Sequence, residues 1–345
     1  MEPEKQAPPP TESPVEAMPP FEAIAKGLKR GQVIPFLGAG VNIRPSLSNV
    51  AGEKKEDLQL PTGSKLSTRL ANYANFPAAT EQEREDLARV ASFVVETVGR
   101  RRLREYLHEL FDQDYETCHI HKYLADLPRP LLIVTTNYDD LTEKAFKAKG
   151  RPYDLVVHPT DRKDVAASVL WWKDGAREPE AFPPNDLPMT ERLRTTTVIY
   201  KMHGTVVRPW HKGQETAPAV EDARPYRNDS YVITEEDYVN FLYRMVQQSA
   251  VPMQFMTYFS NRQFLFLGYG LRDWNLRVVL KNLSAVLPSD AERKRLDDDD
   301  DDNENLPSWA IQYKPSLSER ILWDKRGVNI YNQDINQFVE QLQKY

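Results

Sequence analysis

Four short segments of the chain carry the side chains that could do chemistry. They are Gly38-Ala39-Gly40-Val41-Asn42, Thr135-Thr136-Asn137-Tyr138-Asp139, Lys201-Met202-His203-Gly204 and Gly268-Tyr269-Gly270-Leu271-Arg272-Asp273-Trp274-Asn275. Each segment follows a short apolar run, as is typical of a turn at the end of a buried strand. We therefore expect the four turns to contribute to one site.

His203 is the candidate for proton transfer. An imidazole titrates near neutral pH and serves as a general base in many enzymes. Gly204, the next residue, leaves room beside it. A single histidine is more often structural or exposed, so a structural role stays open at this point.

Asn137 and Asp139 form a second polar pair. The amide of Asn137 is both a donor and an acceptor, so it could hold a water or a ribose hydroxyl while Asp139 orients it. Alternatively, one of the two caps a helix that begins near Leu141. The residue types fit both interpretations.

Two glycine-containing turns are candidates for nucleotide binding. The small residues of Gly38–Asn42 permit close approach to a pyrophosphate, and free amides at a helix start attract anions, although a tight turn alone would look similar. In the late segment, Asp273 and Asn275 fall in the first turn of an expected helix. They could bind ribose or adenine, or complement the helix dipole.

The elements that must position these residues alternate between strand and helix. Strands are predicted at 33–37, 131–135, 198–202 and 264–267, each followed by a turn and a helical pattern. This order predicts an α/β fold with a Rossmann-like parallel sheet flanked by helices, whose binding crevice lies beyond the carboxyl ends of the strands. We expect a helical insertion or small second subdomain at about 60–120 and an irregular insertion at about 158–195.

Composition and charge limit the function classes. The 345 residues are 40% hydrophobic and 28% charged, with a net charge of −6 that the aspartate run at 297–302 accounts for. The remainder is neutral, which does not favour direct nucleic-acid binding. We expect a disordered Pro/Glu-rich tail at 1–20, one domain over 21–345 and an exposed acidic loop at 288–307. No apolar run is long enough for a membrane span, and the start lacks the pattern of a signal peptide, so we expect a cytoplasmic protein.

Together, and in this order, the four segments resemble the sirtuin superfamily, specifically its sirtuin-like branch in bacterial anti-phage defence. The resemblance covers about residues 21–345 and implies a Rossmann-like domain that binds NAD across the strand ends. It implies that His203 is the general base, that Asn137 positions the ribose or the attacking water and that Asp139 supports Asn137. It also implies a set of NAD-binding residues: Gly38, Ala39, Gly40 and Asn42 at the pyrophosphate, Asp273 and Asn275 near the adenosine half, and Thr136, Gly268 and Tyr269 beside them.

The single cysteine, Cys118, separates two branches of this superfamily. Deacylase sirtuins carry a four-cysteine zinc module, which this chain cannot build, so we expect no zinc site and no other metal site. Hydrolysis of NAD to ADP-ribose and nicotinamide is favoured instead. The chain departs from the family pattern at two places. Asn42 stands where the family often has serine, and the interval between Asn137 and His203 is longer than in deacylase sirtuins.

The resemblance also implies regulation, because an enzyme that consumes NAD must be inactive in healthy cells. The sequence contains no ATPase motif and no added sensor segment, so we expect control by homo-oligomerisation or by a partner such as a HerA-type hexameric DNA-translocase ATPase. Two other classes stay open. One is a non-catalytic subunit that binds NAD or ADP-ribose, and the other is a protein deacylase or ADP-ribosyltransferase.

Overall fold

A central sheet organises the molecule. The computed structural model describes residues 18–44, 59–159, 167–176, 178–206, 229–247, 250–269 and 308–345. Within these ranges, nine strands form one sheet in the order β11-β10-β9-β1-β2-β6-β3-β4-β5. Their bounds are β1 (Val33–Leu37), β2 (Leu132–Thr135), β3 (Tyr153–Val157), β4 (Val169–Trp172), β5 (Glu180–Phe182), β6 (Thr197–Lys201), β9 (Gln263–Leu267), β10 (Ser308–Gln312) and β11 (Val328–Asn332).

The sheet is parallel from β11 to β3, whereas β4 pairs antiparallel with β3 and β5 pairs antiparallel with β4. Every residue of β1, β2 and β6 is buried, which explains why these strands read as continuous apolar runs rather than as alternating patterns. The predicted α/β fold with a Rossmann-like parallel sheet flanked by helices is confirmed.

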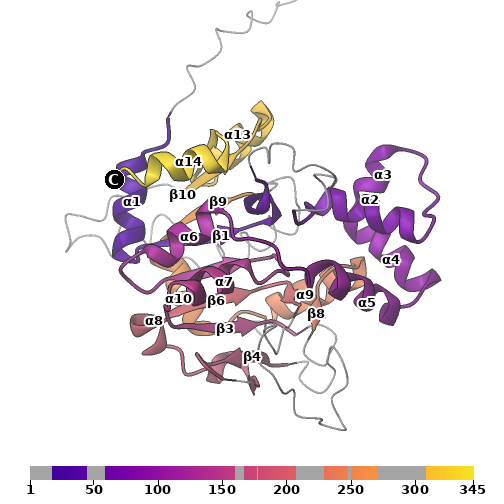
Figure 1. Cartoon of the computed structure of the whole chain (residues 1–345), viewed down its shortest axis with the longest axis horizontal. Coiled ribbons are helices and arrows are strands. Elements are labelled where there is room, and N and C mark those ends of the chain that lie inside the picture. The colour runs from indigo at the N-terminus through magenta and orange to yellow at the C-terminus, as the bar shows by residue number, and fades with distance from the viewer. Residues whose placement is uncertain are drawn as a thin grey trace, which may run out of the picture.

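Helices cover both faces of the sheet (Figure 1). Successive residues of a strand point to opposite faces, so Val33 and Leu37 share a core with α1 (Phe21–Arg30), α6 (His119–Asp126), α7 (Leu141–Ala148) and α14 (Ile335–Leu342). Ile34 and Phe36 face the other core, with α8 (Arg192–Thr195), α9 (Glu235–Val246), α10 (Met253–Ser260) and α13 (Leu317–Asp324). None of the helices in the described ranges is long and apolar enough to cross a membrane.

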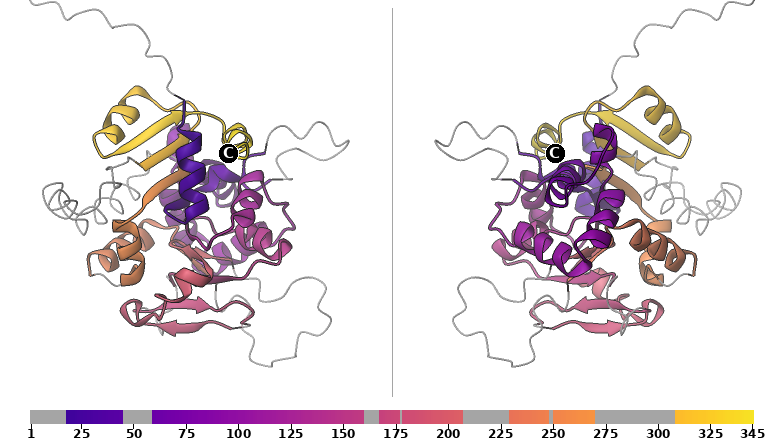
Figure 2. Two further views of the ribbon diagram at one scale, coloured as in Figure 1. Left: turned by 90° about the vertical axis from the view of Figure 1, so that its left-hand side faces the viewer. Right: turned by 90° about the vertical axis from the view of Figure 1, so that its right-hand side faces the viewer.

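A third group of helices lies to one side of the sheet (Figures 1 and 2). It consists of α2 (Gly63–Tyr73), α3 (Glu81–Glu85), α4 (Leu87–Thr97) and α5 (Arg100–Phe111). These helices have their own apolar core, which also includes Tyr138, Val206 and Tyr231. The helical group therefore packs against segments that follow the carboxyl ends of β2 and β6. The predicted division into one domain over 21–345 with a helical insertion stays a prediction.

The expectation of irregular structure throughout 158–195 is wrong for its middle part. The strands β4 and β5 form an antiparallel extension of the sheet at the edge opposite β10 and β11 (Figure 2). Trp171 in β4 donates a hydrogen bond of 3.1 Å to the buried Asp154 of β3, which also accepts from Arg192. Nearby prolines make this segment look irregular in the sequence, but these long-range contacts stabilise a strand there. The predicted acidic loop at 288–307 and residues 1–17 of the predicted tail lie outside the described residues.

Candidate functional site

Five adjacent strands end in one row across the sheet. The last residues of β9, β1, β2, β6 and β3 are in register with their neighbours: Leu267, Leu37, Thr135, Lys201 and Val157. Each of the four segments singled out in the sequence continues beyond its residue in this row. The fold therefore gathers the four turns at one edge, where open parallel sheets bind ligands.

Asn137 lies against the first turn. Its side-chain Nδ2 donates to the Gly38 carbonyl oxygen at 3.2 Å, and its backbone amide donates to the Thr135 hydroxyl at 3.0 Å. That hydroxyl donates in turn to the Leu37 carbonyl at 3.0 Å. Within the described chain, the Asn137 Oδ1 atom has no hydrogen-bond donor, so this half-buried oxygen is available to a ligand.

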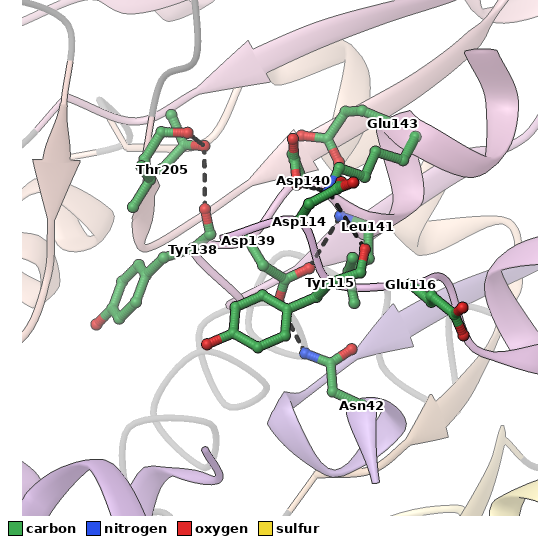
Figure 3. Close-up of polar contacts among 12 residues, drawn as sticks. Asn42, Asp114, Tyr115, Glu116, Tyr138, Asp139, Asp140, Leu141, Glu143 and Thr205 are labelled. Carbon is green, nitrogen blue, oxygen red and sulfur yellow. Dashed lines mark hydrogen bonds and ion pairs between the residues drawn. The ribbon is translucent and has the colours of Figure 1, made fainter. Parts of the chain in front are cut away.

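Asp139 makes one contact that fits the capping interpretation of the sequence and one that the sequence did not predict. Its Oδ1 atom accepts from the Leu141 amide at 3.1 Å, which stabilises the first turn of α7. Its Oδ2 atom accepts from the Asn42 Nδ2 at 2.8 Å (Figure 3). Among the described residues, the Asn42 Oδ1 atom is buried and has no partner. Asp139 therefore both orders α7 and joins the second turn to the first.

The glycines bring two turns together. The Gly38 amide donates to the Leu267 carbonyl at 2.9 Å and the Gly40 amide donates to Gly268 at 2.8 Å. Gly268 has φ +64°, and a Cβ there would lie 2.2 Å from the Val41 nitrogen. Glycine is therefore needed for packing of backbone against backbone. The amides of Gly38 and Gly40 are already engaged, and the pyrophosphate role of this turn stays a prediction.

The structure describes only some of the remaining predicted NAD-binding residues. The half-buried Thr136 donates its amide to Leu37 at 3.2 Å, and Ala39 opens the short 3₁₀ helix that follows Gly38. The ring of Tyr269 contacts Phe36 edge-on, with 5.5 Å between centroids. Asp273 and Asn275 lie outside the described residues.

His203 lies in an aromatic environment beyond the end of β6. Its ring contacts Tyr238 and Phe241 of α9 edge-on, at centroid distances of 5.4 and 5.5 Å. Thr234 caps α9, and its hydroxyl accepts from the Asp237 amide at 3.1 Å. The His203 side chain is only 4% exposed, and burial lowers its pKa to about 3. The imidazole is therefore neutral near pH 7, and the same burial makes it a weaker base than a free imidazole.

His158 belongs to the same neighbourhood, although the sequence did not single it out. It follows Val157, the last residue of β3, and its Nε2 lies 3.4 Å from Arg244 Nη1. Phe241 contacts both imidazoles, at 5.2 Å from His158. Burial is the main cause that lowers the pKa of His158 to about 3, followed by the charges of Arg244 and His203. Its place directly after the apolar end of β3 is the signal that the sequence offers for it.

The pair Cys118 and His121 caps α6. The Cys118 amide donates to His121 Nδ1 at 3.1 Å, and His121 is fully buried. In the part of the chain that the structure describes, no group of three or more His, Cys, Asp or Glu side chains could hold a metal ion. The contacts of His121 thus give it a role in starting α6.

The sequence also matches a known protein family. A model of the SIR2-like domain matches residues 131–331, which include β2, β6 and the turns that follow them. The chain belongs to the SIR2-like family. The resemblance to sirtuin-like proteins that the four motifs predict is confirmed.

Similar proteins include members with named roles. The chain is 25% identical over 271 residues to "NAD(+) hydrolase ThsA" of Acinetobacter baumannii (strain 532279), covering 76% of this chain and 41% of the relative. It is 21% identical over 293 residues to "Defense-associated sirtuin 2" of Bacillus subtilis, covering 83% and 23%. It is 24% identical over 204 residues to "NAD(+) hydrolase ThsA" of Enterococcus faecium, covering 59% and 33%. The SIR2-like chain thus spans less than half the length of each of these relatives.

A solved structure from work on the mechanism and regulation of Sir2 enzymes also resembles the SIR2-like chain. It has a TM-score of 0.44 at 11% identity and covers 95% of this chain and 97% of its own.

Proposed function

We propose that this SIR2-like protein hydrolyses NAD⁺ to ADP-ribose and nicotinamide and depletes NAD⁺ in bacterial anti-phage defence. One observation carries the proposal. Thr135 and Lys201 are register partners on neighbouring parallel strands, and Asn137 and His203 each follow two residues later. The similarity to two NAD(+) hydrolases and a defence-associated sirtuin supports the same activity.

The chemistry needs a base and a group that positions the nucleophile. The bond between nicotinamide and the ribose C1′ breaks, its electron pair leaves with nicotinamide, and a water oxygen forms a new bond to C1′. The proton that this water loses goes to a base. A neutral imidazole has a nitrogen lone pair that can accept it. Burial lowers the pKa of His203 to about 3, which keeps this ring neutral near pH 7 and also makes it a weaker base than a free imidazole. The available Asn137 Oδ1 can accept a hydrogen bond from the water or from a ribose hydroxyl.

Two polar oxygens give the ribose a place to bind. Asn137 Oδ1 has no donor among the described residues, and the buried Asn42 Oδ1 has no partner there either. A buried acceptor without a donor is costly, so a ligand or water that donates to it is favoured. Both side chains contact neighbouring turns, since Asn137 binds Gly38 and Asn42 binds Asp139. Sugar hydroxyls supply the matching donors.

Product analysis tests the proposed reaction. The purified chain is incubated with NAD⁺, alone and with an acetyl-lysine peptide, and the products are separated by chromatography. We expect ADP-ribose and nicotinamide in equal amounts, whether or not the peptide is present. Turnover that requires the peptide, with formation of an O-acetylated product, would contradict hydrolysis and favour a deacylase.

Regulation is a further part of the proposal. The resemblance supports control by homo-oligomerisation or by a HerA-type hexameric ATPase, because unregulated NAD⁺ loss would be toxic. Co-expression with the neighbouring gene, followed by co-purification and size measurement, tests both. A chain that always elutes alone as a monomer would contradict them. The cytoplasmic location expected from the sequence stays a prediction.

A further inference from the structure

Lys201 is a fully buried lysine at the end of β6, two residues before His203. Its Nζ atom lies 2.8 Å from Glu143 Oε1 of α7 and donates to the Thr205 hydroxyl at 3.0 Å. The same ammonium donates to the backbone carbonyl of Asp139. All three donors of the side chain are therefore engaged within the fold.

Stability alone does not account for this lysine. Removing an ammonium and a carboxylate from water is costly, and apolar residues of similar volume are often equally stable in such a position. Burial raises the pKa of Glu143, and the charge of Lys201 opposes that rise. The ion pair with Glu143 offsets the burial of both charges. An apolar side chain could not supply donors to main-chain carbonyls, so that is the specific contribution of Lys201.

Those donors act on the turn that carries Asn137. The carbonyl of Asp139 accepts from Lys201. The carbonyl of Tyr138 accepts from the Thr205 hydroxyl at 3.3 Å (Figure 3). On the opposite side, Asp139 is held by Asn42 and Asn137 donates to a carbonyl of the first turn. The turn is thus fixed through its main chain from β6 and through its side chains from β1.

We propose that Lys201 is a positioning residue that fixes the turn at 137–139 relative to His203, with Glu143 as its counter-ion. This inference rests on the proposed function, in which Asn137 and His203 act on one substrate. Lys201 lies on the strand that ends at His203 and bonds to the turn that carries Asn137. A single side chain thus sets the spacing between the two groups.

The test removes the donors of Lys201 without leaving a buried charge. The double variant Lys201→Met/Glu143→Gln neutralises the pair. Lys201→Met alone would leave the buried Glu143 carboxylate without its counter-ion and would destabilise the folded protein. The matched control is Arg192→Met/Asp154→Asn. It neutralises another pair with a buried carboxylate, toward the amino end of β3 and away from the row of strand ends.

Two readouts separate positioning from stability. In the Lys201 double variant we expect faster hydrogen exchange of the amides at 136–141 and a kcat about 100-fold lower, because small misplacements of reacting groups cost about that much. We expect KM within about threefold of wild type, and the control should keep both the exchange at 136–141 and kcat. Unchanged exchange at 136–141 in the Lys201 double variant would overturn the inference. Hydrogen exchange does not depend on NAD⁺ turnover, so an inactive wild type would contradict the proposed function without deciding the role of Lys201.

Discussion

The side chain of Asn42 donates a hydrogen bond of 2.8 Å to Asp139, a residue 97 positions later in the chain. Both side chains are buried, at 3% and 7% exposure. The bond joins the turn after β1 to the turn after β2, two neighbouring strands near the middle of the sheet. A buried polar pair at this place fixes two parts of the candidate site to each other.

Replacing Asn42 by alanine tests that link. The variant leaves Oδ2 of a buried carboxylate without this donor, so we expect the free energy of unfolding to fall by about 1–3 kcal/mol. Urea unfolding monitored by circular dichroism measures it. Asn185→Ala removes an exposed asparagine and is the control. Equal stability of the two variants would contradict a stabilising role for the bond.

Replacing Gly268 by alanine tests the contact between the two glycine turns. Gly268 has φ +64°, and the new Cβ would lie 2.2 Å from the Val41 nitrogen, so one turn must move. We expect a loss of more than about 1 kcal/mol in the free energy of unfolding, together with loss of NAD⁺ binding. Gly63→Ala is the control, since nothing lies within 4 Å of its Cβ and alanine favours the helix. The interpretation fails if both variants unfold at the same urea concentration.

Arg100 is expected to attach the helical group to α9. Its Nη1 lies 2.7 Å from Asp237 Oδ2, and its Nη2 donates to the Tyr231 carbonyl at 2.9 Å. Asp237 also accepts from the Thr234 amide, so the pair stabilises the start of the helix that contacts His203. We expect Arg100→Met to lower the melting temperature and Arg101→Met, at a side chain that is 91% exposed, to leave it unchanged. Differential scanning calorimetry measures the melting temperature of both variants, and equal melting temperatures would contradict the attachment.

Buried histidines predict that the protein loses stability in mild acid. Burial lowers the pKa of His121 to about 4 and that of His158 and His203 to about 3, against an ordinary value of 6.5. Below pH 6.5 the unfolded chain therefore binds more protons than the folded chain. The free energy of unfolding is unaffected by these groups above pH 6.5 and falls below it, by about 1.4 kcal/mol per pH unit for each histidine.

Urea unfolding between pH 7.5 and pH 4.5 measures this dependence. The variant His121→Asn removes one of the three groups at a helix cap outside the candidate site. We expect its pH dependence to be shallower than that of wild type by about 1.4 kcal/mol per pH unit. Identical slopes would show that His121 is not held neutral by burial.

Much of the site could be predicted because its signals are local. Buried parallel strands are short continuous apolar runs, and glycine or polar residues mark their ends. These local signals predict the turns at Gly38, Asn137, His203 and Gly268, and all four follow strand ends in the structure. The cap of α9 also has a local signal, because the hydroxyl of Thr234 and the acids of the first turn are adjacent in sequence.

The rest depends on contacts between distant segments. The strand β4 is stabilised by the bond from Trp171 to Asp154, and no periodic pattern in its own four residues reveals that partner. The ion pair of Lys201 with Glu143 is likewise invisible until β6 and α7 are packed together. The position of His158 beside the candidate site depends on the register of β3 with β6, which the local sequence does not contain.

The most direct test of the proposed function is NAD⁺ consumption by the wild-type chain beside His203→Ala and the control His119→Ala, whose histidine is exposed. We expect wild type and His119→Ala to release nicotinamide and ADP-ribose at similar rates. We expect His203→Ala to be slower by about 10²- to 10⁴-fold, the usual contribution of a general base. Wild-type turnover by a folded His203→Ala variant would contradict the assignment of His203 as the base.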